Sequence, residues 1–531
     1  MKATTSTGTV HALSQVTADG GESATHRFDG ARRRQFLLGP ARPRSIDGWQ
    51  STTVAPGSLL ESGADLTVAQ ARVGDRELTI LGFILDPTDP SRDDGDIARE
   101  LVSVASLDAL PLATSRFSGR WAIIARHGGA GLVFTDPAGL RQVHYALDRS
   151  GQIWCASQAR LLARVLDLPV DDDADEFARS VYFRSYAEPF WPGEASRYRG
   201  VLRLLPNHTL DLRSGRVARF WPTHALRRDP TADPVHDLAA LLQGSLLAAS
   251  RRAPLALALT AGWDSRTLLA ASHGLAADLL CFTIDNRVGG DNGIDVRIAR
   301  RVTGRSGVRH LVIDGQAVEP GFFDAFQASV DTPHRYCAGH AWGLLRDLPA
   351  GRLAVTGNLS ELGRSYFQTH YPGLPITARG FANVLNMQRS PWAVATIGRW
   401  LDDAMPVAAR YGFDPVDLFH WELYCGTWLA AGQAEWDMAT DTFSPFNGRL
   451  VLETVLSVDP ARRKLPENVL HRDLMRELWP EVLAEPINPE AVRGRVAHAT
   501  KRVAAGLLRR SRLYDRVRDA YLEARSRRSA R

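Results

Sequence analysis

A short stretch of small and polar residues stands between an apolar run and a helix-forming segment near the middle of the chain. Residues 255–259 are apolar, residues 260–265 are Thr-Ala-Gly-Trp-Asp-Ser, and helix formers follow as far as Gly274. This pattern predicts a buried strand, a turn and a helix N-terminus. Because the N–H groups and the dipole of a helix N-terminus attract anions, the stretch predicts a phosphate site.

The loop alone leaves two interpretations open. The Walker sequence Gly-x4-Gly-Lys-Ser/Thr is absent, which excludes an ordinary P-loop. A strand, a turn and a helix also occur in any doubly wound fold, where the turn need not do chemistry. Arg266, early in the helix, either contacts a phosphate or lies on a solvated face.

A second set of candidate ligands recurs at every third position. The set comprises Asp331, His334, Cys337 and His340. Because an α-helix turns once per 3.6 residues, such a stripe drifts around the helix and does not face one ion. Pro333 indicates a helix start. We therefore expect a capped helix with packed side chains and claim no zinc site.

The predicted secondary structure that positions these residues changes near residue 225. Before it, short apolar runs separated by turn residues predict stacked antiparallel sheets. The runs occupy residues 78–85, 120–125, 132–135, 152–156, 201–205 and 208–212, with helices expected at 94–107 and 157–166. Little regular structure is expected before residue 50, where the chain is polar and rich in Gly, Ser and Thr.

After residue 225, apolar strands alternate with helical segments, which is typical of a parallel sheet. Strands are predicted at 255–259, 279–284, 310–313 and 352–356, and helices at 235–250, 265–273, 293–303 and 335–346. Ligands bind such sheets at the carboxyl ends of the strands, where residues 260–265 lie. Residues 360–480 are mainly helical by periodicity.

Length and composition limit the class of protein. A chain of 531 residues is too long for one ordinary core, so two domains and an appendage are expected. No apolar run approaches the ~20 residues that span a bilayer, and no signal peptide is evident, so we expect a cytoplasmic protein without membrane insertion. The four cysteines, Cys155, Cys281, Cys337 and Cys425, are too scattered for a disulfide framework.

The basic character belongs to one tail. Residues 491–531 hold thirteen Lys or Arg against three acidic residues, a local charge of +10, so the formal net charge of +5 leaves −5 for the remainder. The tail could bind nucleic acid or an acidic membrane, yet only Tyr514 and Tyr521 interleave its charges. Docking onto its own chain or onto an acidic substrate, such as a carrier or precursor peptide, is at least as well supported.

Five stretches after residue 225 resemble, in order, the ATP-binding half of the asparagine synthetase and β-lactam synthetase superfamily. Residues 260–265 resemble its Ser-Gly-Gly-x-Asp-Ser pyrophosphate loop. The later matches are Asp295-x3-Ala-Arg with His310, Asp-Thr-Pro at 331–333, Gly-Asn-Leu-Ser-Glu-Leu-Gly at 357–363, and residues 438–447. The last two resemble the family's Gly-Glu-Gly-Ala-Asp-Glu-Leu-Phe-Gly and Met-Ala-x-Ser-x-Glu-x-Arg-x-Pro-Phe-Leu-Asp.

The first half resembles the class II glutamine amidotransferase domain of asparagine synthetases. Residues 117–122, 135–140, 144–145 and 156–161 follow the order and spacing of that domain's motifs. The resemblance implies an Ntn-like antiparallel α+β sandwich, the fold of hydrolases with an N-terminal nucleophile. An α/β PP-loop domain with a helical C-terminal part would follow it. The implied domains are 1–225, amidotransferase-like; 226–490, ATP-binding; and 491–531, a basic helical tail.

One departure concerns the amine donor. The family's glutaminase uses a cysteine exposed at the N-terminus, whose thiolate attacks glutamine. Here Lys2 occupies that position, and the first cysteine, Cys155, falls inside a predicted strand. Glutamine hydrolysis is therefore not expected. β-Lactam synthetases and lasso-peptide cyclases share this loss and take the amine from the substrate.

The resemblance also implies roles for individual residues. It assigns Asp264 and Glu361 to Mg²⁺ and pyrophosphate, although Glu361 could be only a carboxylate favoured at a helix N-terminus. Nucleotide contacts would come from the loop and neighbouring strand ends, namely Leu259, Thr260, Ala261, Gly262, Asp264, Ser265, Thr283 and Gly357. Asn358 replaces a glutamate of the family motif.

The catalytic cation and base are less clearly implied. Counting from Trp479-Pro480 to the family's catalytic lysine reaches Asn488. Lys464, an arginine such as Arg364 or Arg449, or nothing fills that role, and arginine is a poor proton shuttle at neutral pH. Asp441, at the position of the family's glutamate, is either a general base or the structural partner of an arginine.

The expected function is therefore an ATP-dependent ligase that forms an amide bond. With Mg²⁺ and ATP it would adenylate a carboxylate, and an amine of a small-molecule or peptide substrate would displace AMP without glutaminase activity. A natural-product or modified-peptide substrate is expected, and nucleic acid is not. Two alternatives remain open: a ligase of the same fold acting on a cell-envelope sugar acid, and an inactive scaffold, which Asn488, Asn358 and the altered loop would suit.

Overall fold

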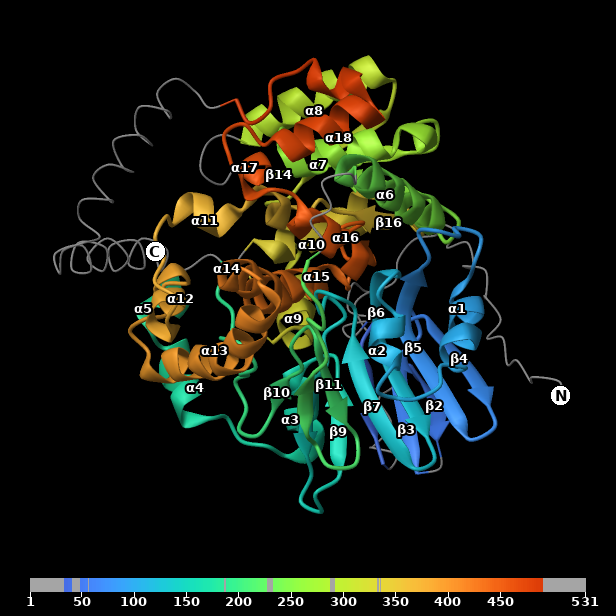
Figure 1. Cartoon of the computed structure of the whole chain (residues 1–531), viewed down its shortest axis with the longest axis vertical. Helices are drawn as coiled ribbons and strands as arrows, with labels where there is room; N and C mark the ends of the chain where they lie inside the picture. The colour runs from blue at the N-terminus through green and yellow to red at the C-terminus, as the bar shows by residue number, and fades with distance from the viewer. Residues whose placement is uncertain are drawn as a thin grey trace.

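The computed structural model describes residues 33–40, 48–55, 57–185, 188–226, 233–286, 292–331, 334 and 336–489. The expected basic tail lies outside these residues. In Figure 1, the antiparallel strands occupy the lower part of the view, and helices of the second half cover the top. No helix in the described part of the chain is long and apolar enough to span a bilayer.

The first half contains two antiparallel sheets of six strands each, with the orders β10-β8-β9-β1-β3-β2 and β12-β11-β7-β6-β5-β4. The first is built from β1 (Phe36–Gly39), β2 (Trp49–Ala55), β3 (Ser58–Gly63), β8 (His144–Leu147), β9 (Ile153–Ala156) and β10 (Leu202–Arg203). The second is built from β4 (Val68–Val73), β5 (Arg76–Leu85), β6 (Ser118–His127), β7 (Ala130–Thr135), β11 (His208–Asp211) and β12 (Val217–Arg219).

The two sheets pack face to face between two layers of helix. Leu38 and Leu60 from the first sheet meet Ile124 and Val133 from the second in one apolar core. Helix α1 (Asp94–Leu101) packs on the outer face of the second sheet, and α3 (Ala159–Leu166) packs on that of the first. The alternating inward and outward side chains of the strands produce this order. The expected antiparallel α+β sandwich is confirmed.

One expectation about this half is wrong. Strand β1, which lies in the region predicted to lack regular structure, is a central strand between β9 and β3. All four of its residues are buried. Four residues are too few to show a periodic pattern, and partners more than a hundred residues away in β9 complete its pairing. Strands β2, β3 and β4 were also missed, because no long apolar run marks them.

The second half is organised around a parallel sheet of five strands in the order β15-β14-β13-β16-β17. Its strands are β13 (Leu255–Ala258), β14 (Leu280–Asp285), β15 (Arg309–Asp314), β16 (Leu353–Val355) and β17 (Thr442–Phe443). Helices α6 (Pro234–Ser250), α7 (Trp263–Ala271), α8 (Asn292–Ser306), α9 (Pro320–Ser329) and α10 (Cys337–Asp347) precede or connect the first four strands. The predicted parallel sheet is confirmed, and the strand order reverses between β13 and β16.

The remaining helices are mostly in the last third of the chain, as predicted for residues 360–480. They are α11 (Tyr366–His370), α12 (Ala378–Val384), α13 (Pro391–Tyr411), α14 (Pro415–Leu418), α15 (Ala430–Trp436), α16 (Arg449–Ser457), α17 (Pro460–Arg463) and α18 (Val469–Leu478), with a π-helix at Phe419–Leu429. The first half adds α2 (Leu110–Ala113), α4 (Asp172–Ala178) and α5 (Val181–Ser185).

The two halves share one hydrophobic core. Phe83 and Leu85 of β5 and Ala138 belong to the same buried cluster as Leu257 of β13 and Leu452 of α16. The switch from antiparallel to parallel strands falls between β12 and β13, near the expected boundary at residue 225. Although the sheets are separate, the packing between them is continuous.

A buried ion cluster joins the halves at the edge of this core. Arg120 binds Asp437 through both Nη atoms, at 2.6 and 2.9 Å, and its Nη1 also lies 3.1 Å from Asp441. Arg141 Nη2 lies 3.2 Å from both carboxylate oxygens of Asp441. Both arginine side chains are almost fully buried. Two arginines from the first half therefore balance two aspartates from the second.

A hydrogen-bond network beside the cluster joins three of the family-like motifs. Asn447 donates to the Gly119 carbonyl at 2.7 Å and to Asp136 Oδ1 at 2.9 Å, and its own Oδ1 accepts from Ala138 N–H at 3.1 Å. Asp136 is fully buried and also accepts the N–H of Arg141 at 2.8 Å. These motifs build the interface between the halves.

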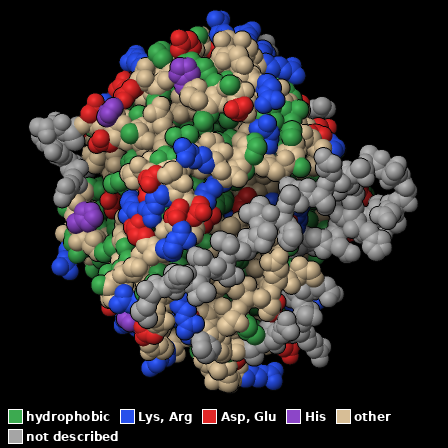
Figure 2. Space-filling view, turned by 90° about the vertical axis from the view of Figure 1, so that its right-hand side faces the viewer, with side chains coloured by type: hydrophobic (Ala, Val, Ile, Leu, Met, Phe, Trp, Pro, Cys, Tyr) green, Lys and Arg blue, Asp and Glu red, His purple; other side chains and the backbone are tan. Residues whose placement is uncertain are grey.

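The surface in Figure 2 carries both signs of charge. Lys and Arg side chains are interspersed with Asp and Glu side chains over the described part of this face. Arg99 and Asp96 form one exposed ion pair, on α1. Interspersed surface charge of this kind contributes little to stability.

We predict that Arg120→Met weakens the fold by roughly 3–5 kcal/mol, because it leaves two buried carboxylates facing a single arginine. The measurement is the unfolding free energy in urea at neutral pH. Arg99→Ala, which removes an exposed ion pair, should change it by less than about 1 kcal/mol. A similar, small effect of both substitutions would show that the cluster does not stabilise the interface.

Candidate functional site

A pocket of about 320 Å³ opens at the carboxyl edge of the parallel sheet. The loops that follow β13 and β16 form one end of it, at the point where the strand order reverses. Open α/β sheets bind ligands at this location, and the volume lies within the range of small-molecule sites.

The loop after β13 is tightly hydrogen-bonded. The Ser265 hydroxyl accepts the Thr260 N–H at 3.0 Å and lies 3.0 Å from the Thr260 hydroxyl. The Thr260 hydroxyl in turn accepts the Gly262 N–H at 3.1 Å. Gly262 is the N-cap of α7 and provides no side-chain cap, so the first N–H groups of that helix have no partner within the helix. The predicted strand, turn and helix N-terminus are all present.

Gly357 allows the second loop to pack against the first. A Cβ atom at Gly357 would lie 2.9 Å from the Cβ of Asp264 and 3.0 Å from the Ser265 nitrogen. No side chain fits in that space. The backbone after β16 therefore passes directly over the N-terminus of α7, which places residues 360–364 beside the loop.

Two carboxylates meet where these loops touch. Asp264 Oδ2 accepts a hydrogen bond from Arg364 Nη2 at 2.8 Å, and its Oδ1 accepts one from the Ser360 hydroxyl. Glu361 lies in the same short 3₁₀-helix (Ser360–Arg364) and lines the pocket with Asp264. One arginine thus faces two acidic side chains.

The electrostatics of Glu361 reflect this crowding. Burial, reinforced by the negative charge of Asp264, raises the pKa of Glu361 to about 7, although Arg364 opposes the shift. The ionised pair therefore carries negative charge that the protein only partly compensates. An oxygen-rich site with excess negative charge is suited to a hard divalent cation.

Residues behind the loop fix its position. Ala261 N–H donates to Asp295 Oδ1 of α8 at 2.8 Å, and its carbonyl accepts the Asn488 N–H at 3.0 Å. The Thr283 hydroxyl donates to the Leu259 carbonyl at 2.7 Å and contacts His310 Nε2 at 2.8 Å. Leu259 and Thr283 are buried beneath the loop. Asn488, which occupies the expected position of the family's catalytic lysine, therefore lies beside this loop.

Of the residues expected in the site, Thr260, Asp264, Ser265, Gly357 and Glu361 line the pocket. Arg364 joins them through Asp264. The same pocket is lined at its other end by residues that the motifs did not indicate, namely Glu188, His334, Tyr336, Cys337, His340, Trp428, Gln433 and Trp436. They come from both halves of the chain, and three of them, His334, Cys337 and His340, belong to the stripe that recurs at every third position.

The structure does not bring Asp441 or Lys464 to this pocket. Asp441 precedes β17 and so lies at the amino edge of the sheet, opposite the loop. Although burial opposes it, the guanidinium groups of Arg141 and Arg120 hold the pKa of Asp441 below its ordinary value. Asp441 is the structural partner of arginines, which was one of its two expected roles. Lys464 is exposed at the end of α17.

Two arginines considered for phosphate have other partners. Arg266 is fully buried and donates to the carbonyls of Val482 at 2.6 Å and Glu485 at 2.8 Å. It anchors the end of the described chain, so neither expectation for it is correct. Arg449 donates to Asn207 Oδ1 at 2.5 Å and lies over Trp221, at the interface between the halves.

The stripe of possible metal ligands separates in the structure. Asp331 accepts the N–H groups of Ala159 at 2.6 Å and Arg160 at 2.7 Å, capping α3, and His340 bonds Asn286. Helix α10 begins at Cys337, later than expected, while Thr332 and Pro333 lie outside the described residues. Asp331 and His340 therefore have partners outside the stripe, whereas His334 and Cys337 lie together, with Nδ1 3.9 Å from Sγ.

The first cysteine of the chain is not placed to act as a nucleophile. Cys155 lies in β9 and is fully buried, and burial raises the pKa of its thiol to about 12. A protonated thiol without access to solvent is not a nucleophile.

Comparisons with known proteins give no close match. The chain matches no protein-family model and no curated protein. Glutamine phosphoribosylpyrophosphate amidotransferase from B. subtilis, complexed with ADP and GMP, aligns over 62% of this chain and 77% of its own with 13% identity and a TM-score of 0.23. A structure of the allosteric regulatory enzyme of purine biosynthesis aligns over 68% and 74%, with 9% identity and a TM-score of 0.24. Scores this low carry no argument about this site.

Glu361→Gln should stabilise the protein at alkaline pH. Because the pKa of Glu361 is raised from 4.5 to about 7, the folded state binds more protons than the unfolded state between these values, and wild-type stability falls as pH rises through them. Glutamine does not titrate. We expect the variant to be about 2 kcal/mol more stable than wild type at pH 8 without divalent cations, and equally stable near pH 4.5.

Urea unfolding at both pH values measures this difference, with Glu467→Gln at an exposed position as the control. A stability difference that is the same at both pH values would contradict the raised pKa of Glu361.

Proposed function

We propose that this chain is an ATP-dependent, AMP-forming carbon–nitrogen ligase of the asparagine synthetase type. It adenylates a substrate carboxylate, releases pyrophosphate and lets a substrate amine displace AMP, forming an amide bond. The observation that carries this proposal is the pair Asp264 and Glu361, held beside the N-terminus of α7 at the switch point of a parallel sheet.

The donor set at this point fits Mg²⁺. Asp264 and Glu361 offer carboxylate oxygens, the ligands that this ion prefers, and the raised pKa of Glu361 indicates negative charge in need of a counter-ion. Bound there, Mg²⁺ would neutralise charge on the phosphates of ATP. Arg364 holds Asp264 in place and adds a permanent positive charge at the same point.

Phosphate binding falls to the loop in this proposal. The hydroxyls of Thr260 and Ser265 and the first N–H groups of α7 bind the pyrophosphate portion of ATP. The backbone at Leu259 and Gly357, just after β13 and β16, and at Thr283, within the adjacent strand β14, carries the nucleoside. Ala261 and Gly262 keep the loop narrow.

Charge on the departing pyrophosphate is stabilised by Arg364, the arginine that the structure places beside Asp264. Asp441 and Lys464 have no catalytic role in this proposal. The first is paired with Arg120 and Arg141 at the opposite edge of the sheet, and the second is exposed. Asn488 can donate hydrogen bonds to a phosphate but carries no charge.

The amine comes from the substrate in this proposal. Cys155 is buried and protonated, so its thiol does not serve as the nucleophile that glutamine hydrolysis requires. The far end of the pocket offers a carboxylate at Glu188 and the rings of Trp428 and Trp436. A carboxylate beside aromatic rings suits an organic amine. We place the substrate among natural products or modified peptides that carry both an acid and an amine, with a cell-envelope sugar acid as the alternative.

Two observations favour a second candidate, an inactive binding or scaffold protein. Both oxygens of Asp264 are hydrogen-bonded, to Ser360 and Arg364, and the position of the family lysine is Asn488. A scaffold needs neither metal nor ATP. Nucleotide binding therefore separates the two candidates.

We expect the wild-type protein to catalyse ATP–pyrophosphate exchange that depends on Mg²⁺ and on one acid from a panel of carboxylates and peptides. Asp264→Ala should reduce exchange by roughly 100-fold or more, since it removes a phosphate-site carboxylate. Lys464→Met should leave exchange within about twofold of wild type, because that lysine is exposed.

Glutamine, added in separate reactions, should not support exchange or release ammonia. Retention of exchange by Asp264→Ala would contradict the assigned site. Absence of exchange with every acid, together with absence of ATP binding in the presence of Mg²⁺, would instead favour the scaffold.

A further inference from the structure

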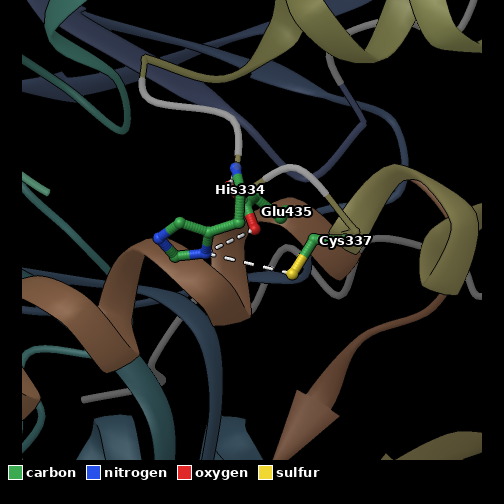
Figure 3. Close-up of side chains that lie close together, drawn as sticks. All are labelled: His334, Cys337 and Glu435. Carbon is green, nitrogen blue, oxygen red and sulfur yellow. Dashed lines mark hydrogen bonds and ion pairs between the residues drawn. The ribbon is translucent and has the colours of Figure 1, made fainter. Parts of the chain in front are cut away.

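Three side chains with different ligand atoms converge at the end of the pocket away from the phosphate loop. His334, Cys337 and Glu435 place a ring nitrogen, a thiol sulfur and a carboxylate oxygen within 4.8 Å of one another. Figure 3 shows them pointing toward one another, His334 and Cys337 from α10 and the segment before it and Glu435 from α15. All three are at least 95% buried.

The distances within this cluster suit a shared ion. His334 Nδ1 lies 2.9 Å from Glu435 Oε2 and 3.9 Å from Cys337 Sγ. Two atoms that each lie about 2.0–2.3 Å from one zinc ion in a tetrahedral site are separated by roughly 3–4 Å. Only a small adjustment of these side chains would therefore bring all three atoms to bonding distance.

One close contact within this cluster lacks hydrogen-bond alignment. Glu435 Oε1 accepts a hydrogen bond from the backbone N–H of His334 at 2.7 Å, which fixes the carboxylate. Glu435 Oε2 is buried and forms an ion pair with His334 Nδ1 at 2.9 Å, and the Pro189 backbone interacts with the His334 imidazole. The contact between Nδ1 and Oε2 is thus close without hydrogen-bond alignment. A buried polar contact without this alignment is weaker than a well-formed hydrogen bond, and a bound cation would give Oε2 a second charged partner.

The charged side chains near the cluster also favour a cation. A second carboxylate, Glu188, lines this end of the pocket and accepts a hydrogen bond from Trp428 Nε1 at 2.8 Å. His334 is the basic side chain that ion-pairs with Glu435 here. Two carboxylates beside one imidazole leave excess negative charge, which a divalent cation would neutralise.

We propose that His334, Cys337 and Glu435 bind a divalent transition-metal ion of the zinc class, at a site separate from the one assigned to Mg²⁺. A mixture of nitrogen, sulfur and oxygen ligands suits such an ion and not the harder Mg²⁺. Binding displaces the thiol proton of Cys337 to solvent, because the thiolate is the ligand. Three protein ligands leave one coordination position, and His334 and Cys337 both line the pocket, so a water molecule or a substrate atom completes the site.

Metal content and a cobalt spectrum test this inference without any assay of activity. The full chain, purified without chelators, should retain about one equivalent of zinc by mass spectrometry of its metals. After replacement by Co²⁺, the wild-type protein should show a thiolate-to-cobalt charge-transfer band. Cys337→Ala should lose that band, and Cys337→Ala and Glu435→Gln should each weaken zinc binding at least about tenfold.

Matched controls isolate the cluster. Cys281→Ala changes another buried cysteine, in β14, and His340→Asn changes a histidine of the same pocket that bonds Asn286; both should bind zinc like wild type. Asp264→Ala should also retain zinc, which keeps this test independent of the proposed ligase activity. Wild-type protein that binds neither zinc nor Co²⁺, or a cobalt spectrum without a thiolate band, would overturn the proposal even if a variant fails to fold.

Discussion

The rest of the structure depends on the buried ion cluster of Arg120 and Arg141 with Asp437 and Asp441. Buried charges of one sign are unstable alone, so each half of the chain requires the other to neutralise them. Asn447 and Asp136 extend the same interface through hydrogen bonds. Because Asp437 and Asp441 lie between α15 and β17, this contact fixes the first half against the parallel sheet. It also brings Glu188 of the first half to a pocket lined mostly by the second.

The pocket combines two chemical environments. At one end, hydroxyls, helix N–H groups and paired carboxylates face the position suited to phosphates and a hard cation. At the other, an imidazole, a thiol and two carboxylates are surrounded by aromatic rings. Oxygen donors and mixed nitrogen, sulfur and oxygen donors select different ions, so the two ends need not compete for the same one. A pocket with two such ends would suit a reaction in which phosphates bind at one end and an amine at the other.

Much of the fold could be predicted from local patterns. Strands β13 to β16 and helices α6 to α8 follow the expected segments closely, because long apolar runs and helix formers report burial directly. Strand β1 could not be predicted, since four residues show no period and its partners lie far away in sequence. Asp441 was placed by motif alone, and only the sheet shows that it lies at the edge opposite the loop. Arg266 was taken as a surface or phosphate residue, yet it is buried against residues 482–486.

The sequence by itself determined the strand, turn and helix N-terminus around residues 260–265 and the alternation of strands and helices in the parallel sheet, because each depends on contiguous residues. Only the tertiary structure decided which acidic and basic groups meet: Asp264 with Arg364 and Glu361, Asp441 with Arg141, and Glu435 with His334. The physical reason is that charge pairing depends on distance in space, and in these pairs the partners are 97 to 300 residues apart. The spacing of these residues along the chain does not predict their distances in space.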